Sequence, residues 1–224
     1  MAKKESVSEF VKTMKLDTPD LMEYTVSVSS DKERQKFINR VKSIVRGSFE
    51  YKDYINLCKT KMDLNKCIFY NNVTSDSGKR GRISIELHHE PFTLHDIVNV
   101  VLQRFLDEGL PINDLLIAEE VLELHYANEV GLVPLSKTAH QIVHNSSKLM
   151  VPLNMVYGEY SKFLDKYDPY IDESLYEKLE KKIDMTNNLT PESFDAIRKE
   201  FTYLAVKDFE EAEKMELQEK IQIA

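Results

Sequence analysis

All six histidines of this sequence lie in one part of the chain, between residues 88 and 144: His88, His89, His95, His125, His140 and His144. Neutral imidazole is a common ligand of zinc, nickel, copper and iron, so a cluster of histidines suits a divalent metal ion. Imidazole also titrates near neutral pH, which suits a general base. The clustering therefore predicts metal binding, acid–base chemistry or both in this segment.

The first pair of histidines follows an expected strand. Apolar and polar side chains alternate over residues 83–87, which is the period of a half-buried strand. Pro91 cannot donate to a strand ladder, so the strand should end near His88 and His89. Because neighbouring side chains of a strand point to opposite faces, these two imidazoles should point to opposite sides.

The second pair belongs to an expected helix. A short apolar run covers residues 130–135, and Ser136 fits the N-cap of a helix over residues 137–145. His140 and His144 are four residues apart, so they share one helical face and can converge on a point. The spacing predicts strand, strand and helix, with three or four histidines meeting at their junction.

Each half of this pattern also has a plainer explanation. A lone pair of histidines at a strand end is commonly solvated, and two histidines four apart on a helix can simply pack. Taken together, they favour a metal site, and ligands from one strand and one helix would leave room for water and substrate. His95 and His125 are interpreted as ordinary residues of two other helices.

The same residues resemble a known motif. The run from Glu86 to His89 followed by Pro91, then residues 132–135 and a helix with His140 and His144, resembles the motif of HNH endonucleases, closest to the colicin and pyocin branch. The whole chain resembles HNH-type proteins encoded by bacteriophages. The resemblance implies a small ββα-metal (HNH-like) core. Helical periodicity elsewhere adds a helical-hairpin insert and a helical C-terminal region, so the expected fold is α+β and predominantly helical.

The resemblance also implies roles for individual residues. His88, His140 and His144 would hold one divalent metal ion, such as Mg, Mn, Ni or Zn, and His89 would be the general base that activates water. A metal ion neutralises charge that develops during phosphodiester hydrolysis, and a base near neutral pKa activates the attacking water. Where the family usually has an asparagine that orients the base, this chain has Gly131. Asn128 or a backbone carbonyl could take that role.

Two functions are therefore expected as alternatives. The resemblance implies a metal-dependent endonuclease, a hydrolase of phosphodiester bonds in DNA that acts in the cytoplasm of the phage host. The alternative is a non-catalytic phage accessory or structural protein that keeps an HNH-like metal fold and binds a protein partner. The glycine at position 131 and the net charge of −8 support this alternative.

Charge is unevenly distributed, which bears on partners. Residues 1–82 contain 17 Lys and Arg against 11 Asp and Glu, residues 83–150 contain 3 against 10, and residues 151–224 contain 10 against 17. Lysine and arginine supply most phosphate contacts, so the basic N-terminal third is the expected DNA-binding part. The acidic C-terminal part suits a protein partner, self-association or solubility.

Three places carry basic side chains that can contact phosphate, two in this basic part and one at the start of the histidine helix. The preferred contacts are Lys79, Arg80 and Arg82 in a turn-rich loop just before the histidine strand, together with Lys137 at the start of the histidine helix. A plain exposed hairpin loop is an equally good interpretation of residues 71–82. The helix expected near residues 31–47 has an apolar stripe and basic side chains, so it could lie along a phosphate backbone or simply pack on the core.

The remaining sequence predicts three regions. They are a basic helical region at 1–66, an HNH-like core at 67–150 with two inserted helices at 93–129, and an acidic helical region at 151–224. The inserted helices are expected to pack the site or recruit a partner. A strand over residues 67–70 is expected to pair with 83–87. Two cysteines, Cys58 and Cys67, are expected to be free thiols, and no segment is long and apolar enough for a membrane span.

Overall fold

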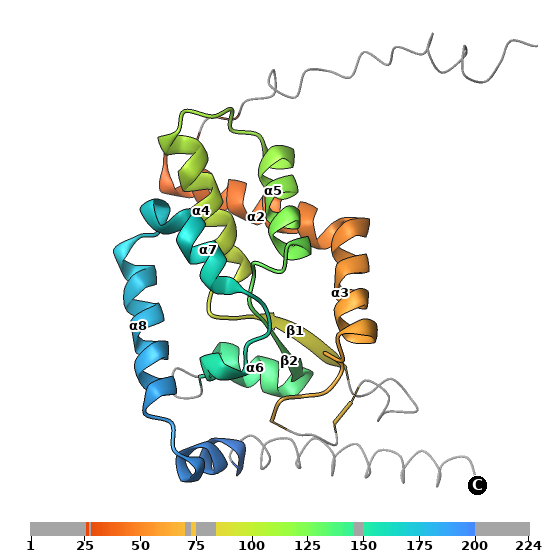
Figure 1. Ribbon diagram of the computed structural model, residues 1–224. Coiled ribbons are helices and arrows are strands. Elements are labelled where there is room, and N and C mark those ends of the chain that lie inside the picture. The colour runs from red at the N-terminus through yellow and green to blue at the C-terminus, as the bar shows by residue number, and fades with distance from the viewer. Residues whose placement is uncertain (1–25, 27, 70–72, 75–83, 146–149, 200–224) are drawn as a thin grey trace, which may run out of the picture.

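The computed structural model describes residues 26, 28–69, 73–74, 84–145 and 150–199. Its fold is α+β and predominantly helical, as predicted (Figure 1). The helices are α2 (Asp31–Gly47), α3 (Phe49–Lys61), α4 (Leu94–Asp107), α5 (Asp114–Tyr126), α6 (Lys137–Asn145), α7 (Tyr160–Tyr167) and α8 (Glu173–Asn187), with short 3₁₀ turns η2 (Leu153–Met155) and η3 (Asp168–Tyr170). The strands are β1 (Ile85–His89) and β2 (Leu132–Ser136).

The two strands form an antiparallel pair that leads directly into a helix. His88 lies opposite Val133 and His89 opposite Leu132, and β2 continues without a break into α6. In Figure 1, α6 lies on one side of this small sheet and most of the helices lie on the other. The predicted order of strand, strand and helix is therefore confirmed.

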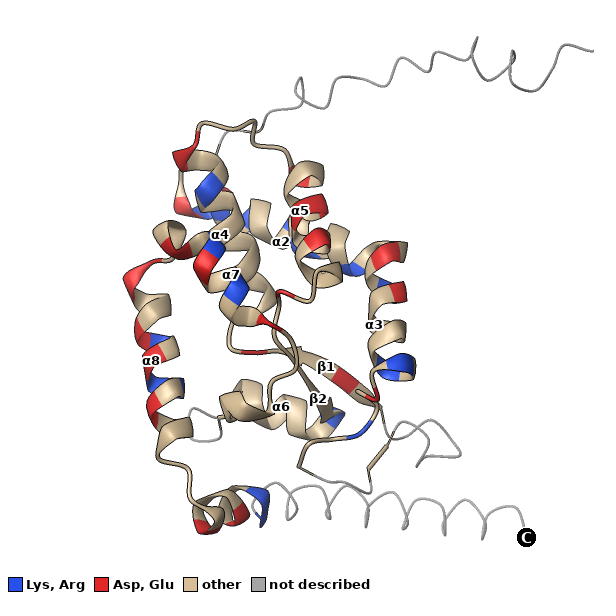
Figure 2. Ribbon diagram, viewed as in Figure 1, with Lys and Arg blue, Asp and Glu red and all other residues tan. Residues whose placement is uncertain are grey.

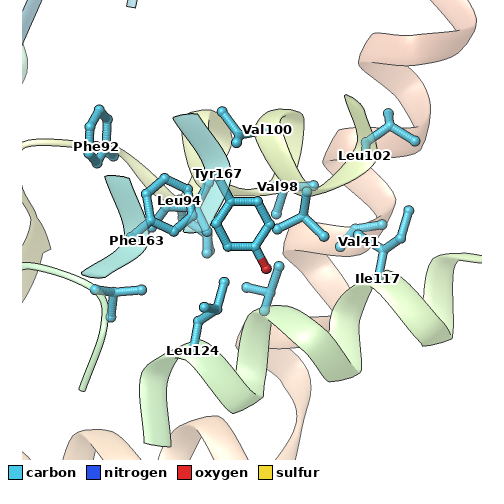
Figure 3. Close-up of a cluster of buried hydrophobic side chains, with 14 of the residues drawn as sticks. Val41, Phe92, Leu94, Val98, Val100, Leu102, Ile117, Leu124, Phe163 and Tyr167 are labelled. Atoms are coloured by element: carbon cyan, nitrogen blue, oxygen red, sulfur yellow. The ribbon is translucent and has the colours of Figure 1, made fainter. Parts of the chain in front are cut away.

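The larger hydrophobic core lies among α2, α4, α5 and α7. Figure 3 shows aliphatic and aromatic side chains from these helices, and from Phe92 just before α4, packed together. The labelled residues are Val41, Phe92, Leu94, Val98, Val100, Leu102, Ile117, Leu124, Phe163 and Tyr167. The two inserted helices, α4 and α5, therefore form the centre of the main core with α2. Residues of all three predicted regions contribute to this core, and the region boundaries themselves stay a prediction.

Local signals explain where α4 begins. The hydroxyl of Thr93 accepts a hydrogen bond from the backbone N–H of Asp96, and the Asp96 carboxylate accepts one from the backbone N–H of Thr93 at 2.8 Å. This reciprocal pair is a capping box, which satisfies backbone donors that the first turn leaves free. The capping box therefore fixes the first residue of α4.

A smaller hydrophobic cluster joins the two strands to α6 and to neighbouring segments of the chain. Its buried residues are Cys67, Phe69, Val73, Ile85, Val133, Leu135, Ala139 and Val151. The strand expected over residues 67–70 beside β1 is not formed in the described part of the chain. Instead the N–H of Ile68 donates to the carbonyl of Pro134 in β2 at 3.1 Å. Pro134 has no backbone N–H. The edge of β2 at Pro134 can therefore accept a hydrogen bond but cannot donate one, so a regular strand ladder does not continue there.

Two further predictions concern isolated features. Cys58 and Cys67 are both buried free thiols, as expected. No helix in the described part of the chain is both long and apolar enough to cross a membrane. Residues 191–199 are also helical, and residues 200–224 of the predicted acidic helical region lie outside the described residues.

Candidate metal centre

Three imidazoles converge between β1 and α6. His88, His140 and His144 each offer a ring nitrogen, and these nitrogens all lie within 4.8 Å of one another. The Nε2 atoms of His140 and His144 are 3.0 Å apart. The His88 ring meets both helical rings edge to face, with centroid separations of 5.1 and 4.9 Å. The ββα unit thus brings together the three residues predicted as metal ligands.

The junction of β2 and α6 fixes this arrangement. Ser136 ends β2, and its hydroxyl accepts a hydrogen bond from the backbone N–H of Ala139 at 3.2 Å. The N–H of Lys137 donates to the carbonyl of Ser84 at 3.1 Å, which joins the start of α6 to the chain entering β1. The predicted cap at Ser136 is therefore present, and it sets the histidine face of α6 against β1.

A carboxylate from β1 orients one of the helical rings. Nδ1 of His140 lies 2.5 Å from Oε2 of Glu86. An ionised carboxylate only accepts hydrogen bonds, so Nδ1 of His140 is the donor. In the neutral ring, Nε2 then keeps its lone pair and faces His144. Metal-binding histidines commonly have such a carboxylate partner behind them.

Burial keeps the strand histidine, His88, in the neutral form. Desolvation first, and then electrostatic interactions with His140, Lys182 and Lys178, lower the pKa of His88 to about 3. A neutral imidazole is the form that binds metal. Nε2 of His88 also lies 3.4 Å from Oε2 of Glu90, whose other oxygen forms a buried ion pair with Lys182 of α8.

The geometry fits a small divalent ion. Two imidazole nitrogens about 2.05 Å from a tetrahedral zinc ion would be separated by about 3.3 Å. The observed nitrogens lie between 3.0 and 4.8 Å apart, so small ring rotations would bring all three to that spacing. His88 is buried, His140 is half-buried and His144 is exposed, so the cluster opens to solvent on the side of α6. Three ligands would leave one position free for water.

His89 points away from this cluster. Its Nε2 lies 2.9 Å from Nε2 of His125 in α5, and its ring stacks on Tyr51 of α3. The prediction that His88 and His89 face opposite sides is therefore confirmed. Burial first, and the charge of His125 next, lowers the pKa of His89 well below its ordinary value. His89 is part of the packing between β1 and the helices.

His125 was expected to be an ordinary helical residue, and its pairing with His89 was missed. Nδ1 of His125 donates to the carbonyl of Val121 at 2.6 Å, so Nε2 accepts the hydrogen bond from His89. Burial lowers the pKa of His125 to about 4. One signal was available, because His125 shares a helical face with the apolar Val121 and Leu122, four and three residues earlier.

Position 131 has no room for a side chain. A Cβ atom on Gly131 would lie 1.8 Å from the carbonyl oxygen of Glu90 and 2.7 Å from Cγ1 of Val156. The N–H of Glu90 donates to the carbonyl of Gly131 at 3.0 Å, which holds the two backbones in this close approach. An asparagine therefore cannot replace Gly131 in this backbone arrangement.

Asn128 occupies a turn after α5. Its φ is +59°, its N–H donates to the carbonyl of His125 at 2.9 Å and its carbonyl accepts from the N–H of Glu159 at 2.7 Å. Its Oδ1 is buried without a hydrogen-bond partner among the described residues. No hydrogen bond joins Asn128 to His89 within that part of the chain. The visible role of Asn128 is to shape the backbone between α5 and β2.

The predicted phosphate contacts are only partly placed. Lys79, Arg80 and Arg82 lie outside the described residues. Lys137 is exposed at the first position of α6, three residues before His140. The basic side chain of Lys137 is therefore close in sequence to the histidine cluster.

Residues 2–221 match the family described as Bacteriophage G278-like virion protein. The chain belongs to this family. The match covers nearly the whole sequence and agrees with the phage origin expected from the sequence. It contains nothing that points to HNH nucleases. No curated protein and no solved structure matches the chain.

Proposed function

We propose that this protein is a component of the phage particle, in which His88, His140 and His144 bind one divalent metal ion. In this account the ion stabilises a ββα unit, and the protein works by binding a protein partner and not by cutting DNA. The observation that carries the metal assignment is the convergence of three imidazole nitrogens within 4.8 Å. The family match supports the placement in the particle.

A structural role for the ion follows from what it would connect. β1 and α6 are far apart in the sequence, and an isolated two-stranded sheet is only marginally stable in water. An ion shared by His88, His140 and His144 would tie the end of β1 to α6. Binding to the folded chain alone stabilises it by mass action, so the metal would contribute directly to folding free energy.

Two features weigh against hydrolysis by this centre. A general base must reach the water it activates, but Nε2 of His89 is held by His125 inside the protein. The position that the resemblance gives to an orienting asparagine is Gly131, where a side chain does not fit. Among the described residues, the centre would therefore have three ligands, but neither an accessible base at His89 nor an orienting side chain at Gly131.

The endonuclease remains the second candidate function because one observation favours it. The order of strand, strand and helix, with ligands from the first strand and the helix, is the one implied by the HNH resemblance. His144 is exposed, so a metal held there would have an open position for water and a phosphate oxygen. The net charge of the chain, −8, opposes the approach of DNA and so weighs against the endonuclease.

Plasmid cleavage separates the two functions. Metal-stripped protein without a histidine tag is given manganese, magnesium, nickel or zinc, and wild type is compared with His89→Ala and His140→Ala. We expect no nicking by any of the three proteins and a lower melting temperature for wild type in EDTA. Metal-dependent nicking that His140→Ala abolishes would establish the nuclease instead. Mass spectrometry of purified particles tests the virion placement, and absence of the chain there would contradict it.

A further inference from the structure

One face of α2 is polar along its whole length. The side chains that share this face, within about a third of the helix circumference, are Lys32, Gln35, Lys36, Asn39, Lys42, Ser43 and Arg46. The opposite face carries the buried Phe37, Ile38, Val41 and Val45, which fix α2 against α4 and α5. We call the first set the α2 strip. Apart from the half-buried Lys42, its members are exposed.

The strip is cationic and has few counter-charges. The only acidic residues of α2 are Asp31 and Glu33 in its first turn, and the Glu33 carboxylate is held by the Ser30 cap. No carboxylate in the described part of the chain forms an ion pair with Lys36, Lys42 or Arg46. Arg40, on the flank of the helix, differs because it pairs with Asp114 at 2.6 Å. Figure 2 shows the basic positions along α2.

These like charges lie close enough to repel one another. Burial first, and the charge of Arg46 next, lowers the pKa of Lys42. Arg46 also stands near His144, where its charge adds to the effects that lower the pKa of that imidazole. Asp96 partly offsets this effect at Lys42, and Lys42 also donates to the Asn39 side chain at 3.4 Å. A row of neighbouring cations without a carboxylate ion pair among the described residues still gives a positive local potential on an acidic chain, and that potential attracts an anion.

The residue types of the α2 strip indicate which kind of anion binds there. Lysine, arginine, asparagine, glutamine and serine are the side chains that contact phosphate and sugar in protein–DNA complexes. The strip has no aromatic side chain on which an unpaired base could stack, which disfavours single-stranded nucleic acid. It also has no exposed aliphatic or aromatic side chain of the kind that anchors protein interfaces.

We propose that the α2 strip binds the phosphate backbone of double-stranded DNA without reading its sequence. From Lys32 to Arg46 the strip extends over about 21 Å, which is long enough to follow several successive phosphates. For a component of a phage particle, this is a contact with the genome. The proposal does not depend on the metal centre, because none of the strip residues belongs to the histidine cluster.

The test is binding of a short fluorescein-labelled duplex, followed by anisotropy at several salt concentrations. The variant Lys36→Gln/Lys42→Gln/Arg46→Gln removes three charges from the strip. The control Lys166→Gln/Lys181→Gln/Lys199→Gln removes three exposed charges elsewhere. Because each phosphate contact adds about 0.9 to the slope of log K against log salt, the strip variant should lose about 2.7 of that slope. The control should retain the wild-type slope.

We also expect the strip variant to bind the duplex at least tenfold more weakly at low salt, with an unchanged melting temperature. Equal binding by the strip variant and the control would overturn the proposal. Displacement of the duplex by polyglutamate at equal charge concentration would also overturn it, since that would indicate an acidic protein partner. Tighter binding to single-stranded DNA would contradict the choice of duplex. Repeating the titration in EDTA should change nothing.

Discussion

Oε2 of Glu86 lies 2.5 Å from Nδ1 of His140, and this contact joins the middle of β1 to the first turns of α6. It fixes which nitrogen of His140 carries the proton and therefore which nitrogen faces His144. Glu86 and His88 lie two residues apart on β1, so they extend from the same face of the strand. One short strand thus supplies both a candidate ligand and the group that orients a second one.

Replacing Glu86 should weaken metal binding without unfolding the protein. Glu86→Gln removes the charge behind His140 and frees its ring to change tautomer, so we expect a loss of about 10- to 100-fold in metal affinity. Isothermal titration with zinc or nickel measures this. Glu119→Gln, on the exposed side of α5, is the control and should bind like wild type. Equal affinity for both variants would exclude a positioning role for Glu86.

The buried ion pair between Lys182 and Glu90 should be more important than an exposed one. Both side chains are buried, and burial lowers the pKa of Lys182 to about 8. Lys182→Met leaves the Glu90 carboxylate without its cation, so we expect a loss of about 3–5 kcal/mol in the free energy of unfolding. Lys178→Met breaks the half-exposed pair with Asp96 and should cost about 1 kcal/mol or less.

A double substitution distinguishes an unpaired charge from lost packing. Lys182→Met/Glu90→Gln removes both charges, so it should recover most of the stability that Lys182→Met loses. Denaturant unfolding of the three variants provides the comparison. If the double variant is no more stable than Lys182→Met, then the cost comes from packing of α8 and not from the buried carboxylate.

Adding one methyl group at position 131 should be strongly destabilising. The Cβ of Gly131→Ala would meet the carbonyl oxygen of Glu90 at 1.8 Å, so β2 or the Glu90 backbone must move. We expect a loss of at least 1–3 kcal/mol, the usual cost of overpacking. Gly47→Ala is the control, since its Cβ would meet nothing within 4 Å. Thermal unfolding gives both values, and similar melting temperatures would contradict the close approach.

The buried histidine pair makes stability depend on pH. The ordinary pKa of His125 is 6.5 and the folded pKa is about 4, so the unfolded chain takes up a proton first as pH falls. The contribution is present above pH 6.5 and is lost progressively toward pH 4. Between pH 7 and pH 5 the loss should be about 2 kcal/mol, at 1.36 kcal/mol per pKa unit.

His125→Gln tests this assignment, because a glutamine oxygen can still accept the hydrogen bond from His89 but does not titrate. Denaturant unfolding of metal-stripped protein at pH 7 and pH 5 should show a drop for wild type that exceeds the drop for His125→Gln by about 2 kcal/mol. The half-buried His95 provides the control, His95→Gln, which should retain most of the wild-type drop. An equal drop in all three proteins would remove His125 as the cause.

The convergence of the three candidate ligands could largely be predicted from spacing alone. Strand alternation separates His88 from His89, and a separation of four residues on a helix aligns His140 with His144. The partner of His89 could not be found in this way, because it depends on how α5 packs across β1. The same limit applies to Glu86, whose contact with His140 depends on the register between the strand and the helix.

The inserted helices show a second limit. Their apolar faces were visible in the sequence, but periodicity does not say which element covers such a face. In the structure α4 and α5 pack on α2, so the segment between the two halves of the histidine pattern forms the main core. Likewise, Gly131 was visible as a departure from the HNH pattern. Its cause is the backbone of Glu90 lying against it, a contact that depends on how β1 and β2 pair.

Metal content tests the central claim most directly. Protein without a histidine tag is incubated with zinc or nickel, desalted and measured by elemental analysis, as wild type, His140→Ala/His144→Ala and the control His95→Ala. The account predicts one ion per chain for wild type and the control, and none for the double variant. No retained metal in wild type, or equal metal in all three proteins, would contradict a metal centre at His88, His140 and His144.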